Sequence, residues 1–95
     1  MATYIVLMNF TEQGIRNVKD SPSRYEAARA VFEKHDIKTR SIYWTVGAYD
    51  IVLTLEGSDE AIMGSLLRLG AQGNVRTQTL RGIGVDEMKA LVSKM

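Results

Sequence analysis

The chain has 95 residues, of which 45% are apolar and 24% charged, and its net charge is +1 at pH 7. This length suits one domain with a modest core, which we expect to span residues 1–95. The near-neutral charge argues against a nucleic-acid-binding surface. The absence of cysteine excludes disulfides, thiolate metal sites and cysteine nucleophiles. The first apolar run is too short for a signal peptide or a membrane span, so we expect a cytoplasmic protein without membrane contact.

Residues 3–10 are β-branched and aromatic and predict a strand. Its apolar side chains fall on both alternating faces, Tyr4, Val6, Met8 and Phe10 on one and Ile5 and Leu7 on the other. Such a pattern is typical of a strand that is buried on both sides. The polar segment 11–20, interrupted by Gly14, predicts a loop.

Ser21 and Pro22 predict the start of a helix, because a serine hydroxyl can cap free N–H groups and proline suits the first turn. This helix should end near residues 35–36. Residues 37–46 and 50–56 alternate between apolar and polar positions and predict two strands. The short Gly47-Ala48-Tyr49 connection between them predicts a hairpin with a tight turn.

A second helix is predicted from Ser58 or Asp59, with Gly70 and Gly73 ending it. Residues 74–83 predict the last strand, and residues 85–95 a short terminal helix. The order β-α-β-β-α-β is that of the split βαβ unit. We therefore predict an α+β, ferredoxin-like fold with an antiparallel sheet and a C-terminal helix.

The two predicted helices cover only one face of such a sheet. The other face would carry apolar residues of the first strand together with Tyr43, Trp44 and Val52. Monomers rarely expose a large apolar patch. We therefore expect a second copy to pack sheet to sheet by two-fold symmetry, giving a homodimer or higher homo-oligomer. The alternative is a sheet face that stays uncovered.

The Gly47-Ala48-Tyr49-Asp50 motif has two interpretations. In the structural one, Gly47 adopts a backbone angle that other residues disfavour, Tyr49 packs over the hairpin, and Asp50 accepts hydrogen bonds from nearby backbone N–H groups. In the functional one, Tyr49 and Asp50 contact a ligand at a subunit edge.

Several polar residues suit a small anionic ligand. The segment before the first helix carries groups that bind anions, and antiparallel pairing brings the start of the last strand beside the end of the first. Arg76 and Gln78 lie within that last strand, where a charge facing a dimer interior needs a partner. The candidate ligand-binding residues are Asn9, Thr11, Arg16, Arg24, Tyr43, Arg76 and Gln78. The alternative is a solvated loop with weak surface pairs.

No catalytic residue or metal site is predicted. His35 is the single histidine and falls at the expected end of the first helix, where a cation is favoured. Because no metal-binding histidine spacing occurs, neither a metal nor a cofactor is predicted.

Residues 41–55, which include the Gly47-Ala48-Tyr49-Asp50 motif, resemble the GYD domain family. Residues 4–16, 21–24 and 73–79 resemble the same family, so the likeness covers nearly the whole chain. The resemblance implies a dimeric α+β barrel and no agreed activity. The hairpin is also similar to the effector-binding domain of AsnC-type regulators, which oligomerises and binds small molecules at subunit contacts. This chain shows no helix-turn-helix segment, so that resemblance implies no DNA binding.

Three functions remain open from the sequence. The first is a homo-oligomeric module that binds a small ligand or regulates another molecule. The second is a cofactor-free enzyme of oxygenase or isomerase type, which fold analogy alone supports. The third is a structural subunit of an assembly.

Overall fold

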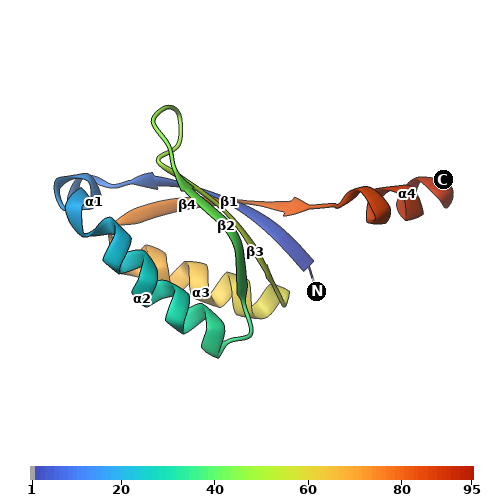
Figure 1. Ribbon diagram of the computed structural model, residues 1–95, viewed down its shortest axis with the longest axis horizontal. Helices are drawn as coiled ribbons and strands as arrows, with labels where there is room; N and C mark the ends of the chain where they lie inside the picture. The colour runs from blue at the N-terminus through green and yellow to red at the C-terminus, as the bar shows by residue number, and fades with distance from the viewer. Residues whose placement is uncertain (1) are drawn as a thin grey trace.

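A computed structural model describes residues 2–95. The strands are β1 (Ala2–Phe10), β2 (Lys38–Trp44), β3 (Ile51–Gly57) and β4 (Val75–Gly82). The helices are α1 (Glu12–Arg16), the 3₁₀ turn η1 (Val18–Asp20), α2 (Ser21–Lys34), α3 (Asp59–Ala71) and α4 (Val85–Ser93). The strands form one antiparallel sheet in the order β2-β3-β1-β4. In Figure 1, α2 and α3 lie on one side of this sheet. The predicted ferredoxin-like α+β fold is confirmed.

The core lies between the sheet and the two long helices. Alternate residues of β1 and β3 point into it, because successive side chains of a strand face opposite sides. Phe32 from α2 and Ile62 from α3 fill the space above them and are almost completely buried. The largest fully buried side chains are Val6, Phe32, Ile37, Leu53, Leu55 and Ile62.

The opposite face of the sheet has no layer over it within residues 2–95. The strand registers place one set of alternating residues on this open face. Its apolar members are Ile5, Leu7, Tyr43, Val52 and Leu80. Trp44, which we expected on this face, lies on the helix side instead, where its ring contacts Tyr25 and donates to Ser21. Tyr43 is 66% exposed and Leu80 is 51% exposed. Strand β1 is therefore apolar on both faces, but only the face toward the helices is buried within this chain.

Helix α4 projects away from the rest of the chain, beyond the end of β4 (Figure 1). Every residue from 83 to 95 is exposed, including the apolar side chains of Val85, Met88, Leu91 and Val92. The radius of gyration is 14.4 Å, larger than the roughly 12 Å of a compact chain of this length. A nine-residue helix is marginal in water without packing. Helix α4 thus has an apolar side that its own chain leaves without a contact surface.

Three predictions about the helices and the segment before α2 are wrong. Residues 11–20 form α1 and a 3₁₀ turn instead of a loop, because the Thr11 hydroxyl caps α1 by accepting from the Gly14 N–H at 3.1 Å. Ser21 does not cap α2; it is the first helical residue, and its hydroxyl accepts a hydrogen bond from Trp44 Nε1 at 2.9 Å. Gly70 lies inside α3, whereas Gly73, with φ of +86°, follows its end as predicted. The Ser58 cap is confirmed.

None of the helices within residues 2–95 is long and apolar enough to cross a membrane.

Gly14 allows α1 to approach the start of β4, and this contact tests the fold. A Cβ atom on Gly14 would lie 2.0 Å from the carbonyl oxygen of Asn74. We expect Gly14→Ala to lower the free energy of unfolding by about 2 kcal/mol or more, because the backbone must move apart. Urea denaturation measures the change.

The matched control is Gly64→Ala in α3, where a Cβ would meet no atom within 4 Å. Alanine favours a helix over glycine, so we expect a gain of about 0.5–1 kcal/mol there. Similar effects of the two substitutions would contradict a close approach at Gly14.

Candidate functional site

The connection between β2 and β3 is a loop of residues 45–50 that rises on the side of the sheet opposite α2 and α3 (Figure 1). The predicted three-residue tight turn is therefore wrong. β2 ends at Trp44, two residues before the predicted end, and β3 begins at Ile51, one residue after the predicted start. The loop stands at the edge of the open face, where it can form the rim of a site.

Asp50 fixes this loop to the central strand. Its Oδ2 atom accepts a hydrogen bond from the backbone N–H of Phe10 at 2.8 Å. Its own N–H donates to the Met8 carbonyl at 2.9 Å, and its carbonyl accepts from the Thr45 N–H at 2.8 Å. The bond to Met8 continues the pairing of β1 with β3 by one residue, and the bond from Thr45 continues the pairing of β2 with β3. This geometry matches the structural interpretation, in which Asp50 accepts a hydrogen bond from a nearby backbone N–H group.

Tyr49 reaches across the open face to the opposite edge of the sheet. Its hydroxyl donates to Gln78 Oε1 on β4 at 3.0 Å. Asn9 lies between them in the sheet, and its side-chain amide donates to the Ala48 carbonyl at 2.8 Å. Side chains of the two neighbouring strands thus hold the loop over one end of the face.

Gly47 does not have the special backbone angle that its interpretation required. Among residues 2–95, the only glycine with positive φ is Gly73, and a Cβ on Gly47 would meet nothing within 4 Å. The loop is held by side-chain hydrogen bonds from Asp50 and Asn9, so it does not depend on glycine at this position.

The predicted ligand residues divide between two sides of the sheet. Asn9, Arg76, Gln78 and Tyr43 share the open face, and the pairing of Asn9 with Arg76 is the neighbourhood that we predicted. Arg76 forms no ion pair with any described residue.

Three other predicted residues lie elsewhere. Thr11 caps α1 and donates to the Gly73 carbonyl at 2.6 Å, and Arg16 is exposed on α1. Arg24 lies on α2, on the helix side of the sheet. The seven candidates therefore do not converge on one pocket.

The open face carries apolar side chains in its two central rows, with some polar groups among them. Ser41 donates a hydrogen bond to Thr54 at 3.0 Å in the same row as Ile5 and Leu80. At one end are Asn9, Arg76 and Gln78, and at the other Arg40 and Glu56 form an ion pair at 2.7 Å. Within residues 2–95, no three His, Asp or Glu side chains gather closely enough to hold a metal ion.

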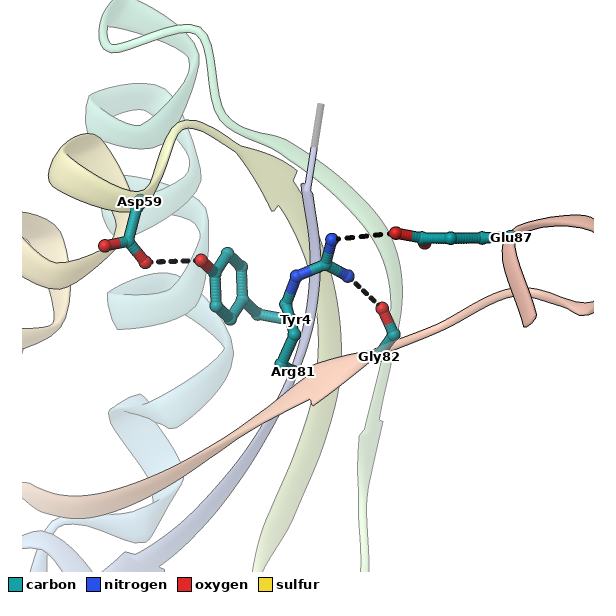
Figure 2. A network of polar contacts seen from close by, with 5 residues as sticks. All are labelled: Tyr4, Asp59, Arg81, Gly82 and Glu87. Atoms are coloured by element: carbon teal, nitrogen blue, oxygen red, sulfur yellow. Dashed lines mark hydrogen bonds and ion pairs between the residues drawn. The ribbon is translucent and has the colours of Figure 1, made fainter. Parts of the chain in front are cut away.

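A polar network at the far end of β1 was not predicted. Figure 2 shows the Tyr4 hydroxyl donating to a carboxylate oxygen of Asp59 at the start of α3. The Arg81 guanidinium lies 5.9 Å from the centre of the Tyr4 ring. It also donates to the Gly82 carbonyl and pairs with Glu87 at 3.2 Å. No local sequence pattern indicates this network, because its members are brought together only by the sheet.

The same network gives α4 its one ion pair with β4. Arg81 and Glu87 are 42% and 50% exposed, and such a surface pair contributes at most about 1 kcal/mol. This contribution orients α4 but is too small to keep an isolated helix folded. The helix therefore receives little support from the rest of the described chain.

Asp50→Ala tests the anchoring of the loop. We expect the free energy of unfolding to fall by about 1–3 kcal/mol, because the Phe10 N–H loses its acceptor in a part-buried position. Asp50→Asn retains a side-chain oxygen and should lose less. Chemical denaturation of both variants measures this order, and an unchanged stability of Asp50→Ala would contradict the anchoring role.

The Tyr4–Asp59 hydrogen bond predicts a pH dependence of stability. This bond, followed by burial, raises the pKa of Tyr4 above its ordinary value of 10.0. A raised tyrosine pKa contributes stability that is complete below the unfolded-state pKa and is lost as pH rises from there through the folded-state pKa. We expect the stability difference between the wild type and Tyr4→Phe to be constant between about pH 7 and 9.

Above about pH 10 this difference should shrink, because the unfolded state then releases the Tyr4 proton before the folded state does. Urea denaturation across that range measures it. A difference that stays constant up to about pH 11 would show that the hydrogen bond does not hold the Tyr4 proton.

Comparisons with known proteins agree with this architecture. MtbAldR, a protein of known crystal structure, superposes with a TM-score of 0.67 at 14% identity, covering 87% of this chain and 52% of that one. This chain therefore spans about half the length of MtbAldR, and the likeness concerns the fold alone. A relative from Thermus thermophilus is 30% identical over 92 residues, covering 95% of this chain and 97% of the relative. It is named the glutamine synthetase and cystathionine beta-lyase binding protein.

The family model of the GYD domain matches residues 4–92. With the relative that aligns over nearly the whole of both chains, this match confirms the resemblance predicted from the hairpin motif and the flanking strands. The chain belongs to the GYD domain family.

Proposed function

We propose that this protein is a homodimeric regulatory module that acts by binding another protein. The observation that carries the proposal is the pair of apolar surfaces that the chain leaves uncovered. One is the open face of the sheet, and the other is the apolar side of α4. Clusters of exposed apolar side chains on a small protein are typical of protein–protein contacts.

A second copy of the chain is the partner that fits the open face. Two such faces can pack against each other around a two-fold axis, because a two-fold contact brings the same patch of both copies together. Helix α4 lies beyond the end of β4, away from the rest of its own chain (Figure 1). In a dimer its apolar side could therefore pack against the partner. This packing supplies the support that the Arg81–Glu87 pair alone does not give.

The relative's name suggests the second kind of partner, a metabolic enzyme. The relative is named for binding two enzymes, and it aligns with this chain over 95% of the present sequence. We propose that this protein likewise binds an enzyme of amino-acid metabolism. Regulation through a bound protein requires no chemistry within the domain itself.

Leu80→Lys tests the dimer. Leu80 is 51% exposed on the open face, and a lysine there would bring two charges into an apolar two-fold interface. We expect the wild type to be a dimer by light scattering at micromolar concentration. The dissociation constant of Leu80→Lys should rise by at least tenfold.

The matched control is Leu67→Lys, because Leu67 is 76% exposed on α3, outside the open face. It should leave the dimer intact. A monomeric wild type, or equal effects of the two substitutions, would contradict the proposed interface.

Binding to an enzyme is tested with purified glutamine synthetase and cystathionine β-lyase from the same organism as the protein. The GYD-domain protein is immobilised, and each enzyme is passed over it at micromolar concentration. We expect saturable binding of at least one of them. Failure of both enzymes to bind, while the protein remains dimeric, would overturn the enzyme-binding part of the proposal and leave the dimer standing.

A further inference from the structure

A cleft on the helix side of the sheet lies apart from the open face. It consists of two adjoining hollows of about 60 and 160 Å³, whose walls share Arg24, Ala28 and Phe32. The inner hollow reaches down to Met8 and Ile51 on the sheet. The outer hollow lies between α2 and α3 and includes Arg68. We call this hollow region the α2–α3 cleft.

The cleft contains hydrogen-bond donors without acceptors. Arg24 donates from Nη1 to the Asn17 carbonyl at 3.0 Å, but its buried Nη2 atom has no partner among the described residues. An unpaired buried guanidinium nitrogen is costly. Ser21 lines the inner hollow, and its hydroxyl already accepts a bond from Trp44, so its own proton is free to be donated. Both residues line the inner hollow, so an acceptor bound there would lie beside both side chains.

The charged side chains that line the cleft are all positive. Arg24 and Arg68 line it, and no Asp or Glu is among the described residues that form its walls. Arginine forms strong, charge-assisted hydrogen bonds with carboxylates. A ligand with a carboxylate therefore gains a partner here, whereas an ammonium group would find no carboxylate to pair with.

The remaining walls are mostly apolar. Tyr25, Phe32 and Leu69 face the inner hollow together with aliphatic side chains of the sheet. The two hollows have room for roughly seven or eight water-sized groups. This space suits a short, branched hydrocarbon chain of four or five carbons attached to a carboxylate.

We propose that the α2–α3 cleft binds a small carboxylic acid with an apolar tail and without an amino group, and that Arg24 binds its carboxylate. Small binding sites commonly combine apolar walls with a few placed polar groups. The site does not rest on the proposed dimer, because the cleft and the open face lie on opposite sides of the sheet. The ligand differs from an amino acid by the missing ammonium group.

Isothermal titration calorimetry of the full chain tests this proposal with three probes of similar shape: 4-methylpentanoate, leucine and 3-methylbutylamine. We expect the carboxylate to bind with a Kd on the order of 0.1–1 mM. Leucine should bind at least tenfold more weakly, and the amine should give no saturable heat. No binding of the carboxylate, or equal binding of leucine, would overturn the proposal.

Two variants locate the site. Arg24→Met retains the apolar stem of the side chain and removes its charge, so the affinity for 4-methylpentanoate should fall by at least tenfold. Ala28→Leu fills the shared wall and should weaken binding to a similar extent. Arg29→Met on the same helix is the control, because Arg29 is exposed outside the cleft and pairs with Glu33 at 3.3 Å. An unchanged affinity of Arg24→Met would contradict the assignment.

Circular dichroism and light scattering of the same variants separate this proposal from the proposed function. Arg24→Met should remain folded and dimeric while it loses the carboxylate. Leu80→Lys should lose the dimer and retain carboxylate binding. If Leu80→Lys lost carboxylate binding while its circular dichroism stayed native, the cleft would depend on the dimer, and the proposed independent site would be wrong.

Discussion

The pairing of β1 on both of its edges is the constraint on which the other features depend. Residues 2–8 of this strand pair with β3, and residues 3–10 pair with β4. Its backbone hydrogen bonds are thereby satisfied within the sheet, while its side chains point alternately to the two faces. Val6 and Met8 are buried beneath the helices, whereas Ile5 and Leu7 reach the open face. This strand is apolar on both faces, and the helices of the chain cover only one of them.

The end of β1 also determines where the polar groups gather. The backbones of Met8 and Phe10 form hydrogen bonds with Asp50. Thr11 donates from its hydroxyl to the Gly73 carbonyl and from its N–H to the Asn74 carbonyl, just beyond α3. Gly14 allows α1 to approach Asn74 because it has no side chain. The loop between β2 and β3, helix α1 and the start of β4 are thus all fastened to one end of the same strand.

The sequence was sufficient to predict the fold because its signals are local and agree with one another. The alternation in β3, the Ser58 cap and Gly73 after α3 are each confirmed by the structure. The hairpin loop was predicted less well, because Asp50 is held by Phe10, which lies 40 residues away in the sequence. Ser21 shows the same limit. A serine before a proline predicts a helix cap, but the Ser21 hydroxyl instead accepts a hydrogen bond from Trp44 on β2.

The candidate site was harder to predict, because successive residues of a strand point to opposite faces of the sheet. Residues that are adjacent in sequence are therefore placed apart, and residues from distant strands share a face. Asn9 and Arg76 lie on one face, as antiparallel pairing predicts. Arg24 was placed in the same group because it follows the same polar segment, yet the direction of α2 turns it to the helix side. A charged residue on a helix gives no sequence signal for the cleft into which it points. That information comes from the packing of α2 against α3.

Met8 and Asn9 show how the two proposed surfaces meet in one strand. Met8 faces the α2–α3 cleft, and the next residue, Asn9, holds the loop over the open face through the Ala48 carbonyl. The Met8 carbonyl also accepts the hydrogen bond from Asp50. Backbone and side-chain groups of this one strand thus serve both sides of the sheet: Met8 lines the proposed ligand site, and the Met8 carbonyl and Asn9 hold the loop at the rim of the proposed interface.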